Sequence, residues 1–312
     1  MKALVTGGAG FIGSNLVDAL IARGDAVAIV DNLTTGKREN VNPDATLHEV
    51  DIRDAGAVRA VFDSAQPDVV FHLAAQADVR KSIDDPAFDA SVNVLGTINL
   101  LEAARHTGAK RFVNTSTGGG IYGEVDVYPT PETVPPQPIA AYGQSKACAE
   151  AYCGWAHRLY GMETVTLRYG NVYGPRQDPS GDAGVIAIFC GRALSGEPAT
   201  IFGDGLQTRD YVYVADIVAA NLLAAEHADA PGRTFNVGTE AESTLLDVVE
   251  ALRAASGKRD FQPDHAPARL GELQRSALDV ALARETLGYR AQVDLREGIA
   301  RTWEWLRGEH AT

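Results

Sequence analysis

The stretch Thr6-Gly7-Gly8-Ala9-Gly10-Phe11-Ile12-Gly13 lies between a short apolar segment, residues 2–6, and a helical pattern that reaches about residue 22. Its glycines at 7, 10 and 13 form a variant of the dinucleotide-binding fingerprint. In that fingerprint the first glycine permits a tight turn, the second admits a pyrophosphate and the third lets the helix pack on the strand. The N–H groups that begin the helix would face the phosphates. We therefore predict a cofactor loop formed by Gly7, Gly10, Phe11, Ile12 and Gly13.

The next strand-like segment, residues 26–30, ends in Asp31, 24 residues after Gly7. A carboxylate at this point accepts hydrogen bonds from the adenosine ribose and repels a 2′-phosphate, so it selects NAD over NADP. Lys37 and Arg38 follow closely and leave a phosphate site open as the alternative. We predict NAD as the cofactor, with Asp31 and Asn32 beside the ribose.

Strand-like and helical segments alternate as far as about residue 169. This alternation predicts an α/β fold, a Rossmann-type doubly wound parallel sheet, in which ligands bind beyond the carboxyl ends of the strands. A long helix is expected over residues 89–105. Further candidate cofactor residues, at these ends or in the segments that follow them, are Asp51, Ile52, Leu73, Ala74, Ala75, Gln76, Asn93 and Tyr169.

A Gly/Pro-rich stretch at residues 169–176 marks the predicted domain boundary. We expect an NAD-binding domain over residues 1–172 and a smaller α/β substrate domain over residues 173–312, with a segment at about 208–238 that returns to the first domain. The proline-rich residues 128–138 cannot form regular structure and are predicted to form a loop that crosses the active-site face.

Charge and composition restrict the class of protein. The net charge is −13 with no basic tract, so nucleic acid is not an expected partner. No apolar run is long enough for a membrane span, and the N-terminus carries no signal-peptide pattern, so we expect a cytoplasmic location. Three cysteines lack the spacing of metal ligands, and no metal site is predicted.

Tyr142-Gly143-Gln144-Ser145-Lys146 begins a helical pattern that reaches about residue 160. Side chains four residues apart lie one turn apart on the same helix face. A nearby cation favours a phenolate, so we expect Lys146 to lower the pKa of Tyr142 from its reference value of about 10. Such a pair is suited to acid/base chemistry.

Taken together, these residues resemble the extended short-chain dehydrogenase/reductase family, and within it the NAD-dependent epimerases and dehydratases of nucleotide sugars. The resemblance covers nearly the full length. Besides the glycine loop and residues 31–33, it is carried by Phe71-His72-Leu73-Ala74-Ala75, the Tyr142–Lys146 stretch, Leu167-Arg168-Tyr169-Gly170-Asn171-Val172-Tyr173-Gly174-Pro175-Arg176 and Arg209-Asp210-Tyr211.

The resemblance implies roles for several residues. Tyr142 would be the acid/base, and Lys146 would bind the nicotinamide ribose. A hydroxyl at Thr117 or Ser116 would bond the reacting sugar oxygen; we favour Thr117. The implied reaction interconverts UDP-glucose and UDP-galactose by oxidation at C4, rotation of the 4-keto sugar and return of the hydride. The resemblance also implies a homodimer, paired through the helix at 89–105 and the helix of Tyr142.

Substrate contacts follow from the same resemblance. It implies that Arg209 and Arg269 bind the diphosphate, that Asn171 contacts the pyrophosphate, and that Ser276 limits the size of the sugar. Arg176 lies in a turn-rich segment and is a further phosphate candidate, because arginine suits bidentate phosphate contact. Thr117 and Tyr142 complete the predicted substrate-binding set.

The residues at these positions also bear on the other activities of the family. The dehydratases carry an Asp-Glu pair after the catalytic threonine, where this chain has Gly118 and Gly119, so dehydration is disfavoured. A 4-epimerase of a UDP-N-acetylhexosamine or of UDP-glucuronate stays open, and a small Ser276 would leave room for an N-acetyl group. A non-catalytic sensor of NAD(P) is a remote alternative. Such proteins typically lose the tyrosine or the lysine, whereas this chain has both Tyr142 and Lys146.

Overall fold

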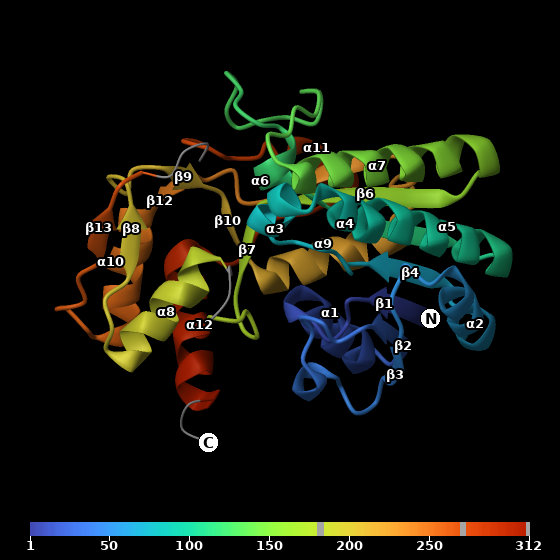
Figure 1. Ribbon diagram of the computed structural model, residues 1–312, viewed down its shortest axis with the longest axis horizontal. Helices are drawn as coiled ribbons and strands as arrows, with labels where there is room; N and C mark the ends of the chain where they lie inside the picture. The colour runs from blue at the N-terminus through green and yellow to red at the C-terminus, as the bar shows by residue number, and fades with distance from the viewer. Residues whose placement is uncertain (180–183, 269–272, 310–312) are drawn as a thin grey trace.

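The computed structural model describes residues 1–179, 184–268 and 273–309, and its centre is one large parallel sheet (Figure 1). The sheet has seven strands in the order β11-β6-β5-β4-β1-β2-β3. The strands are β1 Lys2–Thr6, β2 Ala26–Asp31, β3 Thr46–Glu49, β4 Val69–His72, β5 Arg111–Thr117, β6 Glu163–Tyr169 and β11 Thr234–Val237. The predicted doubly wound α/β fold is confirmed.

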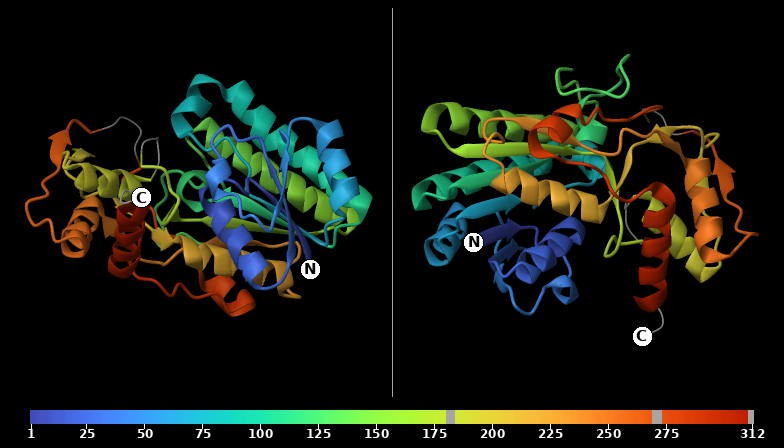
Figure 2. Two further views of the ribbon diagram at one scale, coloured as in Figure 1. Left: turned by 90° about the horizontal axis from the view of Figure 1, so that it is seen from below. Right: turned by 180° about the vertical axis from the view of Figure 1, so that it is seen from behind.

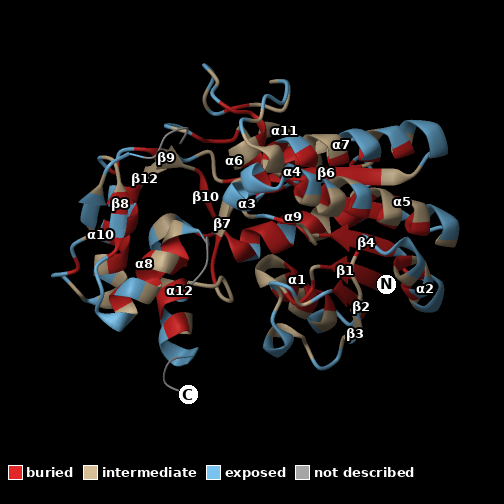
Figure 3. Ribbon diagram, viewed as in Figure 1, coloured by how far each residue is buried: buried red, intermediate tan, exposed pale blue. Residues whose placement is uncertain are grey.

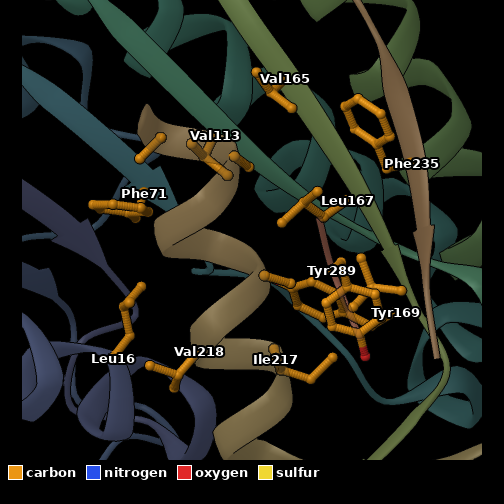
Figure 4. Close-up of a cluster of buried hydrophobic side chains, with 14 of the residues drawn as sticks. Leu16, Phe71, Val113, Val165, Leu167, Tyr169, Ile217, Val218, Phe235 and Tyr289 are labelled. Carbon is orange, nitrogen blue, oxygen red and sulfur yellow. The ribbon is translucent and has the colours of Figure 1, made fainter. Parts of the chain in front are cut away.

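The central strands are buried on both faces, as a parallel sheet between two layers of helices requires; they appear almost wholly red in Figure 3. One face packs against α1 Phe11–Ala22 and α9 Val214–Glu226, where Leu16 and Ile217 meet Phe71 and Val113 (Figure 4). The opposite face packs against α2 Ala55–Ala65, α5 Gly96–Thr107 and α7 Ala141–Tyr160. Figure 2 shows the two helical layers from below and from behind.

The helix expected at residues 89–105 is longer and less regular than predicted. It consists of α4 Pro86–Ala90, a π-helical turn Ser91–Leu95 and α5, which follow one another directly. Proline at the first position and the side chain of Asp85, which accepts from Phe88 N, begin the helix three residues early. The π-helical turn carries the buried Asn93. Such turns recur at functional sites.

A smaller group of elements lies beside the sheet (Figure 1). Its core brings together Phe189, Val248 and Trp303 from three helices. The elements are α8 Val185–Ser195, α10 Leu245–Ser256, α12 Leu295–Glu309 and the paired strands β8 Thr200–Phe202 and β13 Asp264–Ala266. The chain returns to the large sheet at α9 and β11, which pairs with β6. The exact domain boundary stays a prediction.

The remaining elements are short. They are 3-10 helix Arg38–Asn40, α3 Val79–Asp84, α6 Gly118–Ile121, β7 Asn171–Tyr173, β9 Thr208–Arg209, β10 Tyr211–Tyr213, β12 Ser243–Thr244 and α11 Ala281–Leu287. Residues 123–140 form an irregular loop that projects above α6 (Figure 1). Thr130 ties this loop down by backbone hydrogen bonds to Ala277 and Asp279.

Candidate active site

The glycine loop has the geometry of a phosphate cradle. Gly7 has φ +71° and donates its N–H to Val30 O at 2.8 Å, while Gly10 N donates to Gly7 O at 3.0 Å. A Cβ placed on Gly13 would lie 2.1 Å from Gly7 O, so only glycine fits there. The following helix, α1, has no capping side chain. Its first N–H groups are thus available to a phosphate, and the loop fits a dinucleotide.

The predicted cofactor residues converge on one cavity of about 340 Å³ beside this loop. It is lined by the residues predicted from the glycine loop and from the ends of β2, β3 and β4, namely Gly7, Gly10, Phe11, Ile12, Gly13, Asp31, Asn32, Asp51, Ile52, Leu73, Ala74, Ala75 and Gln76. The remaining four, Asn93, Tyr142, Lys146 and Tyr169, do not line this cavity. Asn93 donates to Gln76 O at 2.9 Å, whereas the Tyr169 hydroxyl bonds Asn221 of α9 at 2.7 Å.

The end of β2 suits a ribose without a 2′-phosphate. Asp31 is 7% exposed, and its carboxylate accepts hydrogen bonds from Ala9 N at 3.0 Å and Leu33 N at 2.9 Å. Lys37, one of the two cations that left NADP open, lies 3.5 Å from Asp178, and Arg38 pairs with Glu49. Both cations are therefore engaged with carboxylates rather than gathered around Asp31.

Tyr142 and Lys146 both lie in the first two turns of α7, as the sequence predicts. Tyr142 N donates to Ser82 Oγ at 3.0 Å, which attaches the start of α7 to α3. Lys146 is 3% exposed, and its Nζ donates to Thr115 O at 3.0 Å, at the carboxyl end of β5. Desolvation by the surrounding residues lowers the pKa of Lys146 to about 8.

The expected lowering of the Tyr142 pKa is not found. Desolvation of the phenol and the negative charge of Asp89 raise the pKa of Tyr142 to about 12, opposed by a hydrogen bond from Thr117. The reason is that the Lys146 ammonium is directed to the carbonyl of Thr115 instead of the phenol. The chain alone thus holds Tyr142 as a neutral phenol at neutral pH.

Thr117 and Ser116 lie on opposite faces of β5, because successive side chains of a strand alternate. Thr117 is hydrogen-bonded to Tyr142 and accepts from Gly120 N at 3.1 Å. Ser116 is 3% exposed, and its hydroxyl has no hydrogen-bond partner among the described residues. The structure therefore brings Thr117, and not Ser116, to the tyrosine.

A second cavity, of about 670 Å³, lies between the sheet and the smaller group of elements. Tyr142, Asn171 and Arg209 line it, and Ala77 lines both this cleft and the cofactor cavity, so the two spaces meet beside Tyr142. The side-chain oxygen of Asn171 is buried without a hydrogen-bond partner in the described part of the chain. The sequence did not single out Gln177, Arg192 and Gln207, which also line the cleft.

Two predicted substrate residues do not line this cleft, and a third is not described. Arg176 does not line the cleft; its guanidinium pairs with Asp18 of α1 at 2.6 Å. Ser276 is 8% exposed and borders a small recess together with Gly118 and Gly119. Arg269 lies outside the described residues.

Two buried polar residues near the site were missed. His72, at the end of β4, bonds Thr6 Oγ1 through Nδ1 at 2.8 Å and Thr97 Oγ1 through Nε2 at 2.9 Å. Asp89 of α4 is 1% exposed. A polar residue at the end of an otherwise apolar strand was a signal for His72, but Asp89 shows none, because its burial depends on how α4 packs against α7.

Comparison with known proteins identifies the class to which this fold and site belong. Residues 3–238 match the model of the NAD dependent epimerase/dehydratase family, and the chain belongs to that family.

Within the family the chain is similar to the UDP-glucose 4-epimerase of Mycolicibacterium smegmatis, with 45% identity over 99% of each chain. The crystal structure of a Thermotoga maritima UDP-glucose 4-epimerase with UDP-glucose has 48% identity and a TM-score of 0.96, with 99% of this chain and 100% of that one covered. The Thermus thermophilus UDP-glucose 4-epimerase in complex with NAD has 46% identity and a TM-score of 0.91, with 99% of both chains covered.

Within residues 1–179, 184–268 and 273–309, no three His, Cys, Asp or Glu side chains gather in a way that would hold a metal ion. Among the helices that the structure describes, none combines the length and the apolar character needed to cross a bilayer.

Proposed function

We propose that this protein is an NAD-dependent nucleotide-sugar 4-epimerase that interconverts UDP-glucose and UDP-galactose. The observation that carries the proposal is the position of Tyr142 and Thr117. Tyr142 lines the larger cleft where this cleft meets the cofactor cavity, and Thr117 is hydrogen-bonded to it. Full-length similarity to UDP-glucose 4-epimerases supports the same activity.

Different residues of the chain would bind the cofactor, transfer the proton and orient the reacting groups. The glycine loop would hold NAD+, which would supply the group that takes up and returns the hydride of the sugar C4. As a phenolate, which the positive charges of Lys146 and of a bound nicotinamide would stabilise, Tyr142 takes the proton from the 4-hydroxyl and later gives it back, and Thr117 orients the phenol and the sugar oxygen. Lys146, fixed by Thr115 O, would bind the nicotinamide ribose and contribute a positive charge to the site.

The larger cleft would hold the rest of the substrate. Arg209 and Asn171 line it and would contact the diphosphate, and the unpartnered side-chain oxygen of Asn171 can accept a hydrogen bond from a hydroxyl group. The volume of about 670 Å³ falls in the range of small-molecule sites. A fixed diphosphate with a movable sugar lets the 4-keto intermediate present either face to the cofactor.

A wider sugar range is a second candidate, and it rests on Ser276. The family resemblance assigns this small residue to the limit on sugar size, and it borders with Gly118 and Gly119 a recess of about 10 Å³, which would have to widen to take an N-acetyl group. Turnover of UDP-N-acetylglucosamine alongside UDP-glucose would establish it, and failure with the first substrate only would refute it.

We also infer a cytoplasmic homodimer, paired through α5 and α7. Trp155 and Leu159 of α7 are 38% and 59% exposed, with Tyr152 and Tyr160 close by. Apolar side chains gathered on one helix are typical of an interface. Light scattering should give twice the chain mass for the native protein, and Trp155→Glu should give a monomer.

The test of the function is proton NMR of UDP-galactose incubated with the purified protein and no added cofactor. UDP-glucose should appear, because the cycle returns every hydride and consumes no cofactor. Tyr142→Phe removes one oxygen atom and should reduce the rate by about 10²–10⁴-fold while NAD is still bound. If the wild-type protein forms no UDP-glucose even with NAD added, the proposed function is wrong. An unreduced rate in Tyr142→Phe would exclude the role of the phenol.

A further inference from the structure

Asp89 is a buried carboxylate that none of the roles above uses. It belongs to α4, immediately before the π-helical turn, and is 1% exposed. One oxygen, Oδ1, accepts from Gln76 Nε2 at 3.0 Å and from Asn93 Nδ2 at 3.1 Å. The other, Oδ2, has no hydrogen-bond partner among the described residues. Burial of a carboxylate with one oxygen unpartnered costs free energy.

Both donors connect Asp89 to the active site. Gln76 lines the cofactor cavity. Asn93 Nδ2 also donates to Ser145 Oγ at 3.1 Å, and Ser145 Oγ donates to Tyr142 O at 3.0 Å. Asp89 therefore lies directly behind the first turn of α7, where Tyr142 and Lys146 are carried.

The charge of Asp89 acts on both of these groups. It raises the pKa of Tyr142, second to desolvation, and it opposes the desolvation that lowers the pKa of Lys146. A carboxylate stabilises a nearby ammonium and destabilises a nearby phenolate.

The other polar and titratable side chains around Tyr142 and Lys146 each act on only one of these two residues. Tyr142 is met by Thr117 from β5 and by Ser82 from α3, both neutral. Lys146 is met by Cys153 and Glu150 of its own helix, and by His72 from β4. Burial lowers the pKa of His72 to about 3, which leaves it neutral, and Glu150 is engaged by Arg168 at 2.6 Å. Within the described residues, Asp89 is the carboxylate that bears on both members of the pair.

We propose that Asp89 is a positioning residue that acts electrostatically through Tyr142 and Lys146, and that it sets the pH range in which the enzyme works. The inference rests on the proposed function, since it concerns the same proton transfer. The negative charge of Asp89 helps to keep the buried Lys146 protonated, and it raises the pH at which Tyr142 ionises.

The variant Asp89→Asn isolates the charge. Its amide oxygen can replace Oδ1 and accept from Gln76 and Asn93, and its NH₂ group takes the place of Oδ2, where no donor of the described residues lies. Asp84→Asn is the matched control. It removes the same charge from an exposed position at the end of α3, where solvent and salt screen it.

Two measurements test the proposal. The pH profile of kcat/KM should move to lower pH on both limbs in Asp89→Asn, by roughly one unit, because both ionisations become easier. It should stay in place in Asp84→Asn. Independently of turnover, the ¹³Cε shift of Lys146, assigned with Lys146→Arg, should titrate near pH 8 in the wild-type protein and lower in Asp89→Asn.

The outcomes separate the two proposals. A wild-type protein without epimerase activity would refute the proposed function, while the Lys146 titration would still decide the role of Asp89. An active protein whose profile and Lys146 titration do not move in Asp89→Asn would overturn this inference alone, even if kcat fell. Where Asp89→Asn fails to fold, Asp89→Glu keeps the charge; its profile should then coincide with the wild-type profile, and a shift would contradict the proposal.

Discussion

Thr117 is hydrogen-bonded to Tyr142 across the space between β5 and α7. Thr117 Oγ1 already accepts from Gly120 N at 3.1 Å, so its single proton is available for the phenol oxygen. This bond favours the phenolate, since it opposes the effect of burial on the pKa of Tyr142. The geometry gives the threonine a role that its neighbour on the strand, Ser116, cannot share.

The first prediction compares these two hydroxyls. Thr117→Val preserves the shape of the side chain but removes the donor, and kcat for UDP-galactose should fall by about 10²-fold. Ser116→Ala removes a hydroxyl that has no described partner, so kcat should change by no more than about 3-fold. Steady-state kinetics of both variants provide the measurement. The reverse order of effects would move the role to Ser116.

The second prediction concerns acid stability and His72. Thr97 Oγ1 donates its proton to Asn93 O at 2.6 Å, so it accepts from His72 Nε2, and His72 Nδ1 accepts from Thr6 Oγ1. Neutral His72 is thus fully bonded, and burial lowers its pKa to about 3. In the unfolded chain its pKa is about 6.5. Below that value the unfolded state binds the extra proton, so this contribution to stability is present above pH 6.5 and decreases as the pH falls.

The free energy of unfolding should therefore decrease between pH 7 and pH 5, and His72 should contribute about 2 kcal/mol of that decrease. Urea unfolding of the wild-type protein and His72→Gln at both pH values provides the measurement. The variant should be less stable at pH 7 but lose less stability between the two pH values. Equal losses would mean that His72 does not titrate in this range.

The local sequence contained enough information for the fold and the cofactor site. Gly10 and Gly13 pack against Gly7 in the same loop, and Asp31 follows its strand directly. The candidates at strand ends were brought together because parallel strands place their carboxyl ends at one edge of the sheet. Because the sheet topology is regular, the position of a residue at the end of a strand was enough to predict its place in the site.

The interactions of the charged side chains could not be predicted from the local sequence. The sequence places Lys146 one helical turn from Tyr142, but the ammonium bonds Thr115 O of a distant strand, and Asp89 from another helix acts on the phenol. Arg176 and Arg209 look alike in the sequence, yet one pairs with Asp18 and the other lines the cleft. Side-chain direction and long-range packing decide these outcomes, and neither leaves a periodic pattern.

The third prediction is the choice of cofactor. The protein should bind NAD at least about 10-fold more tightly than NADP, because the carboxylate of Asp31 would face the 2′-phosphate. Lys37→Ala and Arg38→Ala should leave this ratio unchanged, since both cations are engaged with other carboxylates. Fluorescence titrations with the reduced cofactors give the ratio. A drop in NADP affinity in either variant would show that the cation reaches the phosphate.

The fourth prediction separates the two arginines. Arg209 lines the cleft, so Arg209→Ala should raise the KM for UDP-galactose by about 10- to 100-fold, as expected for the loss of one charge-assisted hydrogen bond to a phosphate. Arg176→Ala breaks a partly exposed ion pair with Asp18, so it should leave KM within about 2-fold and change stability by at most about 1 kcal/mol. Initial rates over a range of UDP-galactose concentrations distinguish the two. A large KM effect in Arg176→Ala would mean that its guanidinium leaves Asp18 for the substrate, because a residue that stays in the ion pair cannot reach the cleft.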